Sequence, residues 1–187
     1  MSERTHDCLP NTFYPRWSEM LRDHRHVLIR PIHVQDMAAE RAFIDGLSSQ
    51  ARRFRFLGQI GRPSERLVEQ LTDIDYAHEM AFVAVVREEG REKIVGISRY
   101  SADEDNLQCE CAVTVAEDWQ HQGLGALLMK HLIDVARDRG IGRMYSIDSV
   151  ENVQMNDLAR FLGFTARPDP DDAGQVIHEL ELQGKEG

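Results

Sequence analysis

The chain has 187 residues, 42% hydrophobic and 29% charged, a balance typical of one soluble globular domain with a sizeable core. Its 22 basic and 32 acidic residues give a net charge of −10, which argues against nucleic-acid binding and favours a basic substrate or partner. The longest apolar run, 80–86, is too short to cross a membrane, and the N-terminus lacks the apolar core of a signal peptide. Three cysteines make no disulfide framework, so a cytoplasmic location is expected.

The first 26 residues are polar with scattered aromatic side chains, and we interpret 1–26 as an N-terminal extension before a single domain, 27–187. Apolar and alternating runs then predict six strands. They cover 27–32, 80–86, 93–101, 107–116, 143–150 and 175–182. Helical spacing and capping residues predict five helices. These are 35–46, one capped by Ser48 or Ser49, one opened by Pro63 and Ser64, 123–139, and 152–164.

The order of these elements predicts the fold class. Helices come first, then an antiparallel meander, then a strand–helix–strand–helix–strand series. Such an order indicates an α+β domain whose sheet contains at least one parallel crossover.

The segment between strand 107–116 and helix 123–139 has the features of an anion site. Its residues are, in order, Gln120, His121, Gln122, Gly123, Leu124 and Gly125. The first turn of a helix has unpaired backbone N–H groups and a partial positive charge, and glycine lets a ligand approach the backbone. A pyrophosphate suits such a site. Leu128 stands where the dinucleotide fingerprint needs a small residue, and no Gly-Lys-Ser/Thr sequence is present.

The loop matches the pattern Gln or Arg, two residues, Gly, any residue, Gly or Ala, and by it the chain resembles the GCN5-related N-acetyltransferases. Asn152 after strand 143–150 and the pair Gly163-Phe164 fit the same family. The resemblance spans 27–182 by the order of elements, and implies a mixed, mostly antiparallel sheet of six to seven strands flanked by helices.

The resemblance also implies acetyl-CoA as cosubstrate, without a metal. The loop would bind its pyrophosphate, and the strand before the loop would pair with its pantetheine arm. The coenzyme-binding residues implied are Val113, Thr114, Val115, Gln120, His121, Gln122, Gly123, Leu124, Gly125, Ala126 and Asn152. For His121, exposure to solvent is as plausible as a phosphate contact.

Three stretches look most like the acetyltransferase domain of bacterial protein lysine acetyltransferases: SSQARRFRFLG, DYAHEMAFVAV, and CECAVTV with WQHQGLG. In those enzymes a Glu on the strand before the coenzyme loop is the general base, and Glu110 matches it. A base is needed because a free lysine, with a pKa of about 10.4, must lose a proton before it attacks a thioester. Many members carry a Tyr acid seven residues after the Asn, but Ala159 occupies that position.

We therefore expect an N-acetyltransferase that acts on a primary amine, preferably a protein lysine. One alternative is a small-molecule amine as acceptor, such as a polyamine, an amino acid or an antibiotic. Another is an acyl-CoA sensor without turnover, which the missing Tyr motivates. We expect no nucleic-acid or membrane partner, and a homodimer is left open.

Asp148 is a second candidate for the base and is equally suited to accept a structural hydrogen bond. For the other polar residues the plainer interpretation outweighs the functional one. A surface or packing role is expected for Arg52, Arg53, Arg55, His24, His26, His33 and Trp119, and a core role for Cys109 and Cys111.

Overall fold

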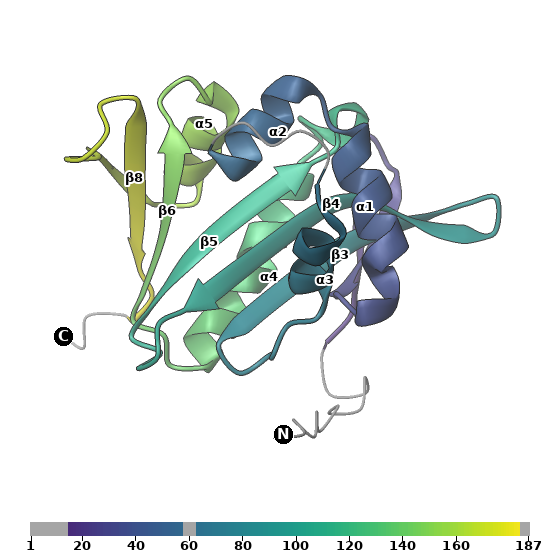
Figure 1. The fold of residues 1–187 in the computed structure, drawn as a ribbon, viewed down its shortest axis with the longest axis horizontal. Coiled ribbons are helices and arrows are strands. Elements are labelled where there is room, and N and C mark those ends of the chain that lie inside the picture. Colours follow the sequence, from purple (N-terminus) through teal and green to yellow (C-terminus); the bar gives the residue numbers. More distant parts are fainter. Residues whose placement is uncertain (1–14, 58–62, 184–187) are drawn as a thin grey trace.

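The computed structural model describes residues 15–57 and 63–183, which form one eight-stranded sheet covered by helices on both faces (Figure 1). The strands are Trp17–Met20 (β1), His26–Pro31 (β2), Glu79–Glu88 (β3), Arg91–Ala102 (β4), Gln108–Val115 (β5), Arg143–Ser149 (β6), Thr165–Pro168 (β7) and Gln175–Glu181 (β8). The helices are Met37–Gly46 (α1), Ser49–Phe56 (α2), Glu65–Thr72 (α3), Leu124–Asp138 (α4) and Val153–Phe161 (α5), with short 3-10 helices at Val34–Asp36 (η1) and Glu117–Trp119 (η2).

The sheet confirms the predicted α+β fold. Its order is β1-β2-β3-β4-β5-β6-β8-β7, and every neighbouring pair is antiparallel except β5 and β6. The parallel pair follows from the crossover through α4, because a helix must carry the chain back to the same edge.

Two strands go beyond the six that the sequence predicted. β1 and β7 each have four residues and occupy the two edges of the sheet. An edge strand needs no long apolar run, and all four residues of β7 are exposed. β1 lies inside the stretch interpreted as an extension, and Leu21, which follows it, is buried. Residues 1–14 lie outside the described residues, so the division of the chain at 26 stays a prediction.

The two faces of the sheet have separate cores. On one face, the apolar stripe of α4 packs against β3, β4 and β5. Gly96 on β4 allows this close approach, because a Cβ there would lie 2.9 Å from Leu128 Cδ1. On the other face, α1 packs against β4 and buries Phe43 and Ile44 beside Ile97. The α1 and α3 side is the face from which Arg99 and Glu110 project, since they alternate with residues that face α4.

Two helix ends confirm predicted capping residues, and a third is capped by Asn152, for which a coenzyme contact was expected. Ser48 Oγ accepts from the Ala51 N–H at 3.1 Å, and Ser64 Oγ accepts from the Leu67 N–H at 3.2 Å. Asn152 Oδ1 accepts from the Met155 N–H at 3.3 Å and so opens α5. Each bond satisfies a donor that the first helical turn leaves unpaired, which fixes where these helices begin.

The pairing of β5 with β6 stops partway along both strands. Registered pairs join Gln108 to Arg143, Cys109 to Met144 and Glu110 to Tyr145. Beyond Glu110 the two strands diverge, as Figure 1 shows, and α2 and α5 lie at the open end. The divergence leaves the backbone of β5 after Glu110 without a neighbour on that side, available to a ligand.

Candidate active site

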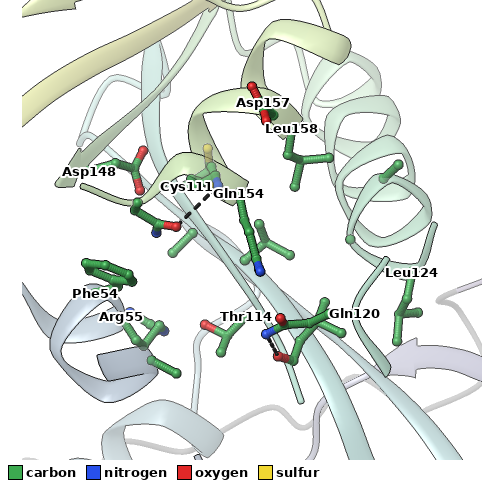
Figure 2. A pocket seen from close by; sticks show the side chains of 18 of the residues that line it. Phe54, Arg55, Cys111, Thr114, Gln120, Leu124, Asp148, Gln154, Asp157 and Leu158 are labelled. Carbon is green, nitrogen blue, oxygen red and sulfur yellow. Dashed lines mark hydrogen bonds between the residues drawn. The ribbon is translucent and has the colours of Figure 1, made fainter. Parts of the chain in front are cut away.

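A cleft of about 460 Å³ opens where β5 and β6 diverge. Its walls come from the second half of β5, the start of α4, the end of β6, and helices α5 and α2. Figure 2 shows Phe54 and Arg55 of α2 on one side, with Gln120 and Leu124 at the loop end. The cleft is large enough for the pantetheine arm of a coenzyme, because ligand pockets commonly measure about 300–1,000 Å³.

The structure brings the sequence-predicted coenzyme residues to this cleft, with one exception. The residues that line it are Val113, Thr114, Val115, Gln120, His121, Gly123, Leu124, Gly125, Ala126 and Asn152. Gln122 is the exception, because its carbonyl points to the turn after β1 and accepts from the Arg22 N–H at 3.2 Å.

The loop places the start of α4 at the cleft. Gly123 has a φ of +89° and precedes the first residue of α4, a conformation that a residue with a side chain adopts only with strain. Gln120 Nε2 donates to the Val115 carbonyl at 3.1 Å and closes the loop onto β5 (Figure 2). A Cβ on Gly125 would lie 3.3 Å from Leu158 Cδ2, so glycine lets α4 and α5 approach. The first-turn N–H groups of α4, which have no partner within the helix, are suited to bind an anion.

Arg22 is a functional candidate that the sequence analysis missed. It lies in the turn between β1 and β2 and lines the cleft. Its Nε would be 3.7 Å from a Cβ on Gly123, so the guanidinium stands beside the anion site. No local pattern links Arg22 to a loop so far along the chain, because the contact is created by packing of the edge strand. It gives the loop a positive charge that its own Gln-His-Gln-Gly sequence lacks at neutral His.

One buried polar atom on the cleft wall has no partner. Thr114 Oγ1 is inaccessible to solvent and makes no hydrogen bond within the described residues. A buried hydroxyl without a partner costs free energy, and rotation of the Thr114 side chain toward the cleft would let an amide group lying along β5 satisfy it. Together with the glycine cradle and the anion site, this atom shows that the residues present fit a molecule with a pyrophosphate and an amide-bearing arm.

Glu110 lies at the end of the cleft where β5 and β6 begin to diverge. It is exposed and is the last residue of β5 that pairs with β6, opposite Tyr145. Burial and the Glu110 charge together raise the pKa of the Tyr145 hydroxyl. On β5, Glu110 is followed by residues that do not pair with β6. Its carboxylate therefore lies next to backbone groups that have no β6 partner.

Asp148 lies on the opposite wall, on β6, and is held by two neighbours. Its Oδ2 accepts from Ser146 Oγ at 2.5 Å and lies 3.0 Å from Nδ1 of His178. His178 is only 2% exposed. The structural role foreseen for Asp148 is therefore present, and its position in the cleft keeps it as a second candidate base. Ala159 is buried, and no tyrosine lines the described part of the cleft.

Two arginines of α2, Arg53 and Arg55, have different environments. Arg53 forms an exposed ion pair with Glu151 at 2.5 Å. Arg55 is half-buried and lines the cleft, so the surface role expected for it is too simple. Burial and repulsion from the Arg99 charge lower the pKa of Arg55 to about 10, which still leaves it charged at neutral pH.

The cysteines of β5 are core residues, as predicted. Cys109 and Cys111 are buried and free. Burial, with the nearby charge of Asp103, raises the pKa of Cys109 to about 12, and burial also raises the pKa of Cys111. Neither thiol is a nucleophile at neutral pH, because the reactive form is the thiolate.

Trp119 packs against the core, with the Arg25 guanidinium 3.7 Å from its ring centroid. Within 15–57 and 63–183, no three His, Cys, Asp or Glu residues gather as metal ligands would. In the same ranges no helix combines the length and apolar character needed to cross a bilayer.

A strand that splays from its neighbour after a carboxylate and runs into a glycine-rich helix start is the arrangement expected of an N-acetyltransferase. The model of the Acetyltransferase (GNAT) family matches residues 48–164, and the chain belongs to this family. It is 56% identical over 166 residues to the acetyltransferase PA5475 of Pseudomonas aeruginosa, which covers 89% of each chain.

More distant relatives agree with this family. The chain is 30% identical over 132 residues to the acetyltransferase Pat of Mycolicibacterium smegmatis, which is 70% of this chain and 38% of that relative. Among solved structures, the GNAT domain of S. lividans PAT superposes with a TM-score of 0.80 at 25% identity. That match covers 89% of this chain and 96% of the other. The resemblance inferred from the loop motif is confirmed.

Proposed function

We propose that the chain transfers the acetyl group of acetyl-CoA to a primary amine, with a protein lysine as the preferred acceptor and Glu110 as general base. The main support for this proposal is the point at which β5 and β6 diverge. Glu110 is the last paired residue, and the unpaired backbone of β5 begins directly after it. A thioester lying along that backbone would end beside the carboxylate.

The coenzyme would be held by the residues of the β5–α4 segment. The first-turn N–H groups of α4 and the Arg22 guanidinium would bind the pyrophosphate, and Thr114 Oγ1 would bind an amide of the pantetheine arm. Backbone N–H groups of β5 after Glu110 would polarise the thioester carbonyl. These contacts would orient the acetyl group toward Glu110.

Glu110 accepts the proton that the acceptor ammonium must lose, directly or through one water molecule. The neutral nitrogen then attacks the carbonyl carbon and a C–N bond forms. The nitrogen, now positively charged, loses its second proton to water as the C–S bond breaks and the thiolate leaves. A free thiol has a pKa of about 8.5, so the thiolate can leave without a tyrosine acid and take its proton from water. The absence of a tyrosine at Ala159 is therefore compatible with turnover.

The rim of the cleft supports a macromolecular acceptor. Phe161 of α5 is 73% exposed and Leu57, after α2, is 42% exposed, and both line the cleft. Exposed apolar side chains around a polar site are typical of protein-binding surfaces. The net charge of −10 also favours a basic partner.

The test combines calorimetric titration with acetyl-CoA and a thiol-release assay on a panel of lysine peptides, proteins and small amines. Glu110→Gln should lower kcat by about 10²-fold or more while leaving the affinity for acetyl-CoA unchanged. Glu117→Gln is the matched control, because Glu117 is equally exposed and lies outside the cleft.

The outcomes separate the candidate functions. Release only with free amines would replace the protein lysine by a small-molecule acceptor. Binding of acetyl-CoA with no release on any acceptor would favour a sensor without turnover. Equal activity of the Glu110→Gln variant and the unchanged protein would remove Glu110 as the base.

A further inference from the structure

A second cavity, of about 160 Å³, adjoins the cleft on the face of the sheet that carries α1 and α3. The two spaces share Arg55, Glu110, Cys111 and Ala112 as walls. An acceptor whose amine reaches Glu110 would therefore extend into this second cavity.

The sheet register explains why the cavity exists. Arg99 on β4 lies between Ala81 on β3 and Ala112 on β5, and these small side chains leave space around its guanidinium. Two residues along β4, Ser101 lies between Glu79 and Glu110 in the same way. The cross-strand row that contains Arg99 thus lies about 7 Å from the cross-strand row that contains the carboxylates of Glu79 and Glu110.

The arginines of this cavity are short of partners. Arg99 Nη2 donates to the Leu71 carbonyl at 3.0 Å, and its nearest ion-pair distance to Glu40 is 3.7 Å. Arg99 Nε is buried and makes no hydrogen bond within 15–57 and 63–183. Arg55 makes none to any described residue and lies 5.1 Å from the Phe56 ring centroid. Five donors in each guanidinium are a large capacity to leave unused in a partly buried place.

Arg30 shows what a saturated arginine looks like on the same sheet. It is 5% exposed and forms a two-pronged pair with Asp36, both contacts at 2.8 Å. A third bond, to Glu92, measures 2.6 Å. No comparable set of acceptors surrounds Arg55 or Arg99 in the described residues, so these two retain capacity for an anion.

Within the described residues, the neighbouring carboxylates make no hydrogen bond to the two arginines, since Glu40 lies 3.7 Å from Arg99 and its Oε2 is buried without a partner. Burial raises the pKa of Glu40, against the charges of Arg99 and Arg55, and burial with the charge of Asp75 raises the pKa of Glu79. The cavity therefore combines a carboxylate base at one end with guanidinium donors that no carboxylate saturates at the other.

We propose that Arg55 and Arg99 bind a carboxylate of the acceptor, so that the enzyme prefers amines with a carboxylate within about 7 Å of the reacting nitrogen. This inference rests on the proposed function and adds the class of acceptor. The carboxylate has two possible sources, an acidic residue beside a protein lysine or the α-carboxylate of an amino acid. Both place the anion on the arginines while the amine faces Glu110.

The experiment compares acceptors that differ only in the carboxylate. One arm uses peptides with Lys-Glu against Lys-Gln, and the other uses free amino acids against their amides, both read by thiol release. The carboxylate member of one arm should have a kcat/KM higher by about tenfold. The arm that shows the preference identifies the source of the carboxylate.

Variants connect the preference to the arginine. Arg55→Gln should abolish the preference while the KM for acetyl-CoA stays within about twofold, and Arg55→Lys should retain part of it because it keeps the charge. Arg53→Gln is the matched control, because Arg53 is on the same helix and pairs with Glu151 outside the cavity. Equal use of both members of each pair, or a preference that survives Arg55→Gln, would overturn the inference.

A binding measurement keeps the inference testable if no acceptor turns over, the result that would remove the proposed function. Calorimetric titration with the Nε-acetyllysine peptides needs no chemistry. The Glu-containing peptide should bind about tenfold more tightly than the Gln-containing one, with the difference lost in Arg55→Gln. Equal affinities of the two peptides, together with equal affinities of an Nα-acetylated amino acid and its amide, would overturn the carboxylate site independently of catalysis.

Discussion

The two ends of the active-site cleft are built in different ways. The proposed coenzyme end is one continuous segment, from Val113 on β5 to Ala126 on α4, and the groups proposed to bind there are mostly backbone N–H groups of a helix start. The acceptor end brings together side chains from separate elements, including Arg55 of α2, Arg99 of β4 and Glu110 of β5. Backbone groups recognise what all members of a family share, whereas side chains can change one at a time.

This difference suggests how the two ends respond to mutation. A change at the coenzyme end should affect every acceptor equally, because all reactions use the same acyl donor. A change at the acceptor end should alter the choice of amine and leave coenzyme affinity unaltered. The variants that follow test this separation, starting with the one expected to have the largest effect.

Gly123→Val should weaken acetyl-CoA binding by about 10- to 100-fold, the loss expected when one or two charge-assisted hydrogen bonds to the pyrophosphate are blocked. The side chain would also strain a backbone with a φ of +89°. Calorimetry with acetyl-CoA measures the affinity, and the loss should be the same whichever acceptor is present.

The control for backbone strain is Gly140→Val. Gly140 follows α4 with a φ of +78°, and a Cβ there would meet nothing within 4 Å. This variant should lose stability by about 1–3 kcal/mol and keep its coenzyme affinity. If both variants lost affinity alike, the loop would not be the coenzyme site.

Asp148→Asn should lower kcat by about tenfold, less than Glu110→Gln, since we assign the main proton transfer to Glu110. Asp148 is held by Ser146 and His178, so its replacement also loosens the wall of the cleft. Steady-state kinetics with one acceptor compares the two variants directly. A larger loss in Asp148→Asn than in Glu110→Gln would exchange their roles.

The same contrast explains how far the sequence could predict the molecule. The helix starts at Ser48 and Ser64, and the loop around Gly123, depend on residues within four positions of each other, so local patterns identify them. The strands with apolar runs were equally visible. The short edge strands β1 and β7 were missed because they carry almost no buried side chains.

The acceptor end could not be predicted for a related reason. Arg55, Arg99 and Glu40 are far apart in the chain and meet only because α1 and α2 pack over the same face of the sheet. A charged residue in a strand or a short helix looks the same in sequence whether it meets solvent or a cavity. Tertiary packing, which single-sequence patterns do not record, decides between the two.

Arg22→Gln should produce the smallest effect, an increase of about three- to fivefold in the Kd for acetyl-CoA, because an exposed charge contributes about 0.5–1 kcal/mol. The residue stands beside Gly123 but reaches it from the turn after β1, outside the continuous coenzyme segment. The effect should shrink as salt is raised, because solvent ions screen exposed charges.

Arg87→Gln serves as control, since Arg87 is exposed at the far end of β3, away from the cleft. Titrations at low and high salt measure both variants. An unchanged Kd in Arg22→Gln would show that the backbone of the loop binds the pyrophosphate without help, which would make the coenzyme end a purely local device. A Kd that is higher in Arg22→Gln at low salt, and equal to that of the unchanged protein at high salt, would show that the Arg22 charge adds to coenzyme binding. Packing of the edge strand places that charge beside the loop.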